Sequence, residues 1–112
     1  DVPGQLLADA RTILPPRDYA LAEMIIDALD ERGFLTVDVA EVAAATQRSL
    51  EDIERVLATL QAIAPAGVAA RDLRESLLLQ LAYLKEMGIE VPELVERIIE
   101  DHLTSGITGT SR

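Results

Sequence analysis

The run at residues 65–81 constrains the fold of this chain more than any other segment. Pro65 and Gly67 end any helix that arrives from upstream, because proline lacks an amide donor and glycine readily takes positive φ. Asp72 is then placed to cap a new helix, with Glu75 three residues on as the reciprocal partner of a capping box. The run therefore predicts two helical segments separated by a sharp turn.

The helix that follows this turn is apolar on two sides. At 100° per residue, one stripe consists of Leu73, Leu77, Leu78, Leu81 and Leu84. A second side carries Leu79, Tyr83 and Met87. Both sides of such a helix must be covered, and we expect the second side either to pack under the last helix of the chain or to contact a partner directly.

The rest of the chain also has helical signals. Apolar periodicity predicts helices at residues 5–14, 16–32, 38–45, 49–64, 72–86 and from 92 onward. The residues expected to begin or end helices are Pro16, Gly33, Asp38, Ser49, Gly88 and Pro92. The only strand signal is a few residues around 34–37. The class is all-α, a multi-helix bundle.

We expect two small helical subdomains joined at the Pro-Ala-Gly-Val turn, within one domain at residues 1–103. The first subdomain covers about 17–64 and the second covers 65–103. Residues 104–112 are rich in Ser, Thr and Gly, which predicts a disordered tail. The chain opens with Asp1 rather than methionine, so we expect it to be a fragment of something longer.

The net charge of −10 is the strongest compositional constraint. Nucleic-acid affinity comes largely from Lys and Arg that neutralise phosphates, and this chain has one lysine and nine scattered arginines. We therefore expect a poor independent nucleic-acid binder and a partner with an electropositive protein surface. The chain has no cysteine, which excludes disulfides and thiolate metal sites and permits an intracellular setting. No apolar run approaches the roughly 20 residues that span a bilayer, so we expect no membrane association.

Residues 38–61 have the outline of a helix-turn-helix, with a turn at 46–49. In a DNA reader the start of the second helix enters the major groove, and here that start is acidic. The acidic residues are Glu51, Asp52 and Glu54, and Arg48 and Arg55 do not outweigh them. We interpret the unit as a packing scaffold, with DNA reading kept as the alternative.

Two groups of charged residues are candidates for partner binding. The acidic helix face Glu23, Asp27, Asp30 and Glu31 either docks on a basic partner or is simply solvated. Asp30 and Glu31 fall at the expected C-terminal end of that helix, where they oppose the helix dipole. Arg71 and Arg74 are not explained by capping, and either tie the turn to nearby acidic groups or reach a partner. The full candidate set is Glu23, Asp27, Asp30, Arg71, Arg74, Leu79, Tyr83 and Met87.

Catalytic signals are lacking in the sequence. His102 is the only histidine, and its neighbours Glu100 and Asp101 do not face it on a helix. No Gly-rich phosphate loop or nucleophile elbow occurs. We expect no enzyme activity, no metal and no cofactor.

The run at 65–81 resembles the most distinctive segment of the core-binding region of RpoN-type (sigma-54) sigma factors. That segment reads roughly Asp-Pro-Ala-Gly-Val-Gly-Ala-Arg-Asp-Leu-Arg-Glu-Cys-Leu-Leu-Leu-Gln-Leu. Residues 25–35 and 53–64 resemble two further pieces of the family in the expected order, so the similarity runs from about 19 to 103. The motif residues are Pro65, Ala66, Gly67, Val68, Ala70, Arg71, Asp72, Leu73, Glu75, Leu78, Gln80 and Leu81. The departures are Ala64 for Asp, Ala69 for Gly and Ser76 for Cys, and an alanine at 69 implies a negative φ there.

The resemblance implies a bacterial, cytoplasmic transcription initiation factor, with this chain as its core-binding domain. The partner would be core RNA polymerase. Promoter DNA and an ATP-hydrolysing activator would be engaged only through regions outside this chain, and the isolated chain would be a monomer. Two other classes stay open: an independent helix-turn-helix DNA-binding regulator, and a helical oligomerisation module that self-associates through Leu79, Tyr83 and Met87.

Overall fold

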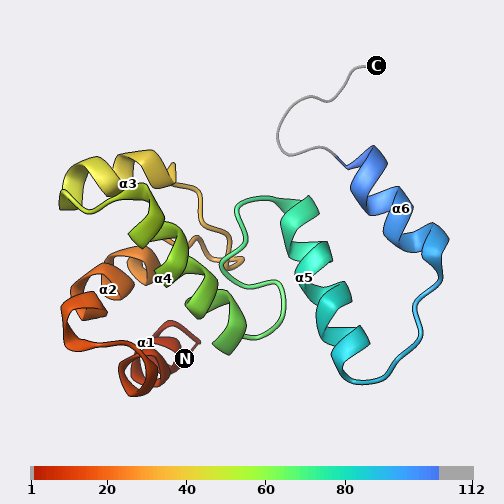
Figure 1. Cartoon of the computed structure of the whole chain (residues 1–112), viewed down its shortest axis with the longest axis horizontal. Helices are drawn as coiled ribbons and strands as arrows, with labels where there is room; N and C mark the ends of the chain where they lie inside the picture. The colour runs from red at the N-terminus through yellow and green to blue at the C-terminus, as the bar shows by residue number, and fades with distance from the viewer. Residues whose placement is uncertain (1, 104–112) are drawn as a thin grey trace.

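The computed structural model describes residues 2–103, and within them the regular structure is helical (Figure 1). The expected all-α class is confirmed. The proposed tail at 104–112 lies outside the described residues. The helices are α1 Val2–Ile13, the short 3-10 helix η1 Pro16–Asp18, α2 Tyr19–Asp27, α3 Val39–Thr46, α4 Leu50–Ile63, α5 Leu73–Glu86 and α6 Glu93–His102.

Three helices begin at the capping residues that the sequence predicts. The Asp38 carboxylate accepts the amide of Ala40 at 3.0 Å, at the start of α3. The Ser49 hydroxyl accepts the amide of Asp52 at 3.0 Å, at the start of α4. The Asp72 carboxylate accepts the amide of Glu75 at 2.8 Å, at the start of α5. Each side chain satisfies an amide that has no partner within its helix.

Helix α2 is shorter than expected, because it ends at Asp27 rather than near residue 32. The carboxylate of Asp30 accepts the amides of Arg32 and Phe34, both at 2.9 Å, and so favours a turn over continued helix. Gly33 lies in this turn with a φ of 90°. The expected strand around 34–37 amounts to one isolated antiparallel bridge between Leu29 and Leu35.

The main hydrophobic core lies among α1, α2, α3 and α4, which gather on one side of the molecule (Figure 1). We call these four helices, with the turns between them, the N-terminal body. Its core is aliphatic, and α4 contributes an apolar stripe that is almost completely buried. The largest fully buried apolar side chains are Ile25, Ile53, Val56, Leu57 and Leu60.

Helices α5 and α6 form a hairpin on the other side of the molecule (Figure 1). Within this hairpin, the buried apolar side chains are Leu81 and Ile99. The segment before α5 joins it to the N-terminal body by main-chain hydrogen bonds. The amide of Ala69 donates to the Gly33 carbonyl at 2.7 Å, and the amide of Leu35 donates to the Ala70 carbonyl at 2.8 Å.

The expectation of a negative φ at Ala69 is wrong, because this residue has a φ of 73°. Ala69 is completely buried, and its carbonyl accepts a hydrogen bond from Gln61 Nε2 at 3.0 Å while its amide is bonded to Gly33. These contacts hold a left-handed backbone that costs an L-residue about 1–2 kcal/mol. The close backbone approach suited to the family's glycine is therefore kept, with an alanine methyl group accommodated inside.

Candidate protein-binding surface

Arg71 connects the start of α5 to α4. Its guanidinium lies 2.9 Å from a Glu75 oxygen and 3.1 Å from a Glu54 oxygen. Burial raises the pKa of the Glu75 carboxyl, but hydrogen bonds from the Arg71 side chain and amide lower it more, so the net pKa is below its usual range. The hydrogen bond to Glu75 raises the pKa of Arg71. Of the two roles expected for Arg71, the structure shows the tie to neighbouring acidic groups.

Glu75 does not close the capping box in the expected way. Its carboxylate accepts the amide of Arg71 at 2.8 Å, one residue before the capping residue Asp72. The other carboxylate oxygen accepts Gln61 Nε2 at 3.1 Å. Glu75 therefore binds the turn and α4 together, rather than only the start of its own helix.

Arg74 differs from Arg71. It is half-buried, and no ion pair joins it to another residue in the described part of the chain. Its role as a partner-binding residue stays a prediction.

The second apolar side of α5 is not covered by the last helix. The Tyr83 and Met87 side chains are 49% and 60% exposed, and Leu79 is half-buried. Helix α6 packs on α5 elsewhere, since the buried apolar residues of the two helices are Leu81 and Ile99. The expectation that α6 covers this side is therefore wrong, because Tyr83 and Met87 stay exposed beside it.

Leu79 and Tyr83 instead line an open groove between α5 and the end of α4. The groove has a volume of about 560 Å³, and the turn between the two helices forms part of its wall. Its lining is mostly small and apolar. The lining residues are Gln61, Ala62, Ala64, Pro65, Ala66, Leu79, Ala82, Tyr83 and Glu86.

The acidic residues predicted to share one helix face are divided between two settings. Glu23 and Asp27 are exposed on α2, whereas Asp30 lies in the turn after it. The hydrogen bond from the Phe34 amide lowers the pKa of the Asp30 carboxyl. Because α2 ends at Asp27, the predicted continuous face and its conflict with the helix dipole are wrong. Asp30 has a structural role that accounts for its presence.

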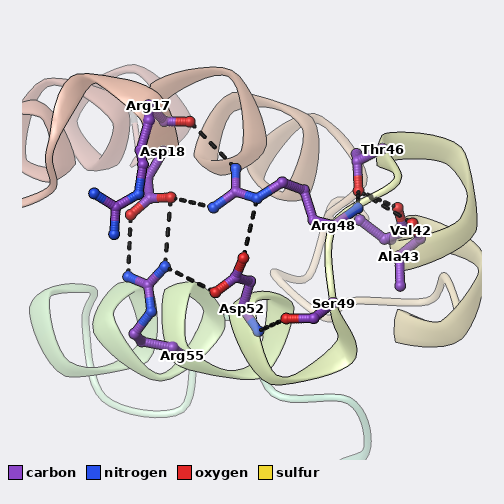
Figure 2. Close-up of polar contacts among 9 residues, drawn as sticks. All are labelled: Arg17, Asp18, Val42, Ala43, Thr46, Arg48, Ser49, Asp52 and Arg55. Carbon is purple, nitrogen blue, oxygen red and sulfur yellow. Dashed lines mark hydrogen bonds and ion pairs between the residues drawn. The ribbon is translucent and has the colours of Figure 1, made fainter.

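A buried carboxylate that the sequence interpretation missed lies beside the α3–α4 turn (Figure 2). Asp18 has no exposed surface, and both of its oxygens accept hydrogen bonds from arginine side chains. Arg48 is one donor, and Arg55 is the other at 3.0 Å. Asp52 extends the network, because it pairs with Arg48 at 3.2 Å and with Arg55 at 3.4 Å. Burial raises the pKa of Asp18, but the hydrogen bonds from Arg55 and Arg48 outweigh it, and the net pKa is lowered.

This network bears on the helix-turn-helix alternative. Arg48 and Arg55 are the cationic side chains near the start of the second helix, and both neutralise Asp18 rather than extend freely into solvent (Figure 2). Glu51 remains exposed at the same helix start. Arg48 and Arg55 are therefore less available to phosphates than the sequence alone indicates.

Residues 2–103 hold neither a cluster of metal ligands nor a membrane-spanning helix. Over residues 2–103, no three His, Cys, Asp or Glu side chains converge as metal ligands. No helix in that range has the length and apolar character needed to cross a membrane.

Comparisons with known proteins identify the family. Residues 3–107 match the family model described as "Sigma-54 factor, core binding domain". The chain is 47% identical over 90 residues to the RNA polymerase sigma-54 factor of Caulobacter vibrioides, an alignment that covers 80% of this chain and 17% of the relative. It is 42% identical over 89 residues to the RNA polymerase sigma-54 factor of Escherichia coli, covering 77% of this chain and 18% of the relative.

The matched region is a small part of those relatives. A third relative, the RNA polymerase sigma-54 factor of Acidithiobacillus ferridurans, is 42% identical over 83 residues, which are 74% of this chain and 18% of the relative. The chain thus spans less than a fifth of the curated relatives it matches. The match to the family model nevertheless includes every helix described above apart from Val2, the first residue of α1. The chain belongs to the sigma-54 factor core-binding domain family.

Proposed function

We propose that this chain binds core RNA polymerase as the core-binding domain of an RpoN-type transcription initiation factor. The observation that carries the proposal is the family match at residues 3–107, which covers the N-terminal body and the hairpin together. In the full-length factor, this docking would let polymerase be directed to promoters in an activator-dependent way. The setting would be the bacterial cytoplasm.

The remaining functions of such a factor would lie outside this chain. We propose that promoter DNA and the ATP-hydrolysing activator are engaged by other regions of the full-length protein. The chain itself would be a non-enzymatic binding module and a monomer in isolation.

The charges of the chain support a protein partner over a nucleic acid. Its net charge is −10, and Arg48, Arg55 and Arg71 are all paired with carboxylates of the chain itself. Phosphate neutralisation by these three arginines would require breaking their pairs. An electropositive protein surface would instead be attracted to the acidic chain at long range.

The direct test is a binding titration of the 112-residue chain, carrying a fluorescent label, with purified bacterial core RNA polymerase. We expect saturable binding that unlabelled chain competes away. The same labelled chain should not bind a duplex promoter fragment at low salt. A helical, folded sample that binds no polymerase would contradict the proposal.

A further inference from the structure

The groove between α4 and α5 is an open depression that is large enough to accept a side chain. Its volume of about 560 Å³ falls within the range of roughly 300–1,000 Å³ that is usual for binding pockets. Four of its lining residues are alanines, which leave room, while Leu79 and Tyr83 offer apolar contact. Interfaces draw most of their affinity from a few large side chains that fill pockets of this kind.

The walls of the groove are held in place by contacts on both sides of the Pro65 turn. Arg71 pairs with Glu54 of α4, and Gln61 of α4 donates to the Ala69 carbonyl. Gly67 lies so close to α5 that a Cβ atom there would be 2.6 Å from the Ser76 hydroxyl. The position of α5 beside the end of α4 is therefore specified before a partner arrives, which lowers the ordering cost of binding.

Carboxylates lie at two edges of this surface. Glu86 lines the groove, and it has no ion pair with any described residue. A smaller adjoining cavity shares Ala64 and Pro65 with the groove and is lined by Asp9, which also has no ion-pair partner in residues 2–103. The apolar depressions on either side of Pro65 are thus each accompanied by one negative charge.

We propose that this groove receives a large apolar side chain from a segment of core RNA polymerase that also carries Lys or Arg. The inference rests on the proposed function and assigns it a place on the chain. Charge selects this occupant, because a basic segment would pair with Glu86 and Asp9. A second copy of the chain would bring another net charge of −10 against the first, so self-association through the groove is disfavoured.

The first test fills the groove. Ala82→Trp places an indole where the partner side chain would bind, and Ala44→Trp makes the same change at an exposed site on α3 as a matched control. In titrations of the 112-residue chain against core RNA polymerase, we expect Ala82→Trp to bind about tenfold more weakly or worse, as hot-spot changes do. Ala44→Trp should bind like the unmodified chain. Circular dichroism of both variants checks that they keep the helix content of the unmodified chain.

The second test reverses one charge. We expect Glu86→Lys to weaken binding at low salt, and the difference from the unmodified chain to shrink as salt screens the interaction. Glu100→Lys, an exposed change of the same sign on α6, is the control and should have a smaller effect.

The possible outcomes separate the groove from the proposed function. If the unmodified chain binds polymerase and Ala82→Trp binds equally well, the groove proposal is overturned and the proposed function stands. If the unmodified folded chain does not bind polymerase, both are overturned. Sedimentation showing a dimer that Ala82→Trp dissociates would also overturn the proposal, in favour of self-association.

Discussion

The N-terminal body and the α5–α6 hairpin are both built from amphipathic helices, yet they bury their apolar residues to very different extents. In the body, Ile25, Ile53 and Leu60 have no exposed surface. In the hairpin, Leu81 and Ile99 are the buried apolar side chains, and many others remain exposed. The exposed large apolar side chains of the hairpin and its connecting loop are Leu73, Tyr83, Leu84, Met87, Ile89, Leu94, Val95 and Ile98.

This difference indicates different sources of stability. The body has a core of fully buried aliphatic side chains, whose burial stabilises it. The hairpin depends on its attachment through Ala69, Ala70 and Arg71, and it keeps apolar surface available for contact. Variants in the two regions should therefore behave differently.

The largest effect is expected from a core truncation in the body. Leu57 is 1% exposed, so Leu57→Ala should lower the free energy of unfolding by about 2–5 kcal/mol, because it removes buried contacts and leaves a cavity. Leu94 of the hairpin is 66% exposed, and Leu94→Ala should change the free energy of unfolding by no more than about 0.5 kcal/mol. Urea denaturation measures both. Similar losses for the two variants would remove the distinction between the regions.

A smaller loss is expected from the buried network of the body. Asp18→Asn should lower the free energy of unfolding by about 1–3 kcal/mol, because it replaces charged hydrogen bonds to Arg48 and Arg55 with weaker ones. Because the folded-state pKa of Asp18 is lowered from 3.8, its stabilisation is present above that pH and is lost as the pH falls below it. Denaturation measured from pH 6 down to pH 3 should therefore show a shallower acid loss for Asp18→Asn than for the unmodified chain. Equal acid dependence would contradict this role for Asp18.

The next effect concerns the attachment of the hairpin. Arg71 is 40% exposed, so solvent partly screens its ion pairs. Arg71→Ala should therefore lower the free energy of unfolding by no more than about 1 kcal/mol. Its effect should be local, because Arg71 contacts α4 and α5 without reaching the core of the body. We expect faster native-state hydrogen exchange in α5, with little change in α2. A uniform acceleration over both regions would show that the hairpin and the body unfold as one unit.

The smallest effect is expected at Ala69. Ala69→Gly removes the cost of a left-handed backbone at an L-residue, which stabilises the folded state by about 1–2 kcal/mol. It also removes a buried methyl group and increases the conformational freedom of the unfolded chain, and both of these effects destabilise the folded state. The opposing terms leave a net change below about 1 kcal/mol, which thermal unfolding can measure. A large loss of stability would mean that the alanine methyl group, rather than the backbone geometry, matters at this position.

Prediction from the sequence was correct where the local structure depends on residues that are close together in the chain. Asp38, Ser49 and Asp72 cap helices as predicted, because each acts on an amide two or three residues away. The predictions for the end of α2 and for the φ of Ala69 were wrong. In both cases hydrogen bonds around the Gly33 turn outweighed the local preference.

The features that the sequence did not reveal depend on distant contacts. Asp18 precedes a helix and has the appearance of a cap, but its side chain makes no capping bond and pairs with Arg48 and Arg55 far along the chain. Periodicity identified two apolar sides of α5 but could not say which one α6 covers. The groove beside Tyr83 follows from that choice and appears only in three dimensions.

Hydrogen exchange of the 112-residue chain, alone and bound to core RNA polymerase, tests the central claim most directly. The claim is that the chain docks through the surface that its own fold leaves uncovered beside the Pro65 turn. We predict new protection concentrated in α5 and in the segment that follows α4. Protection confined to α3 and the start of α4, with α5 unchanged, would contradict the account.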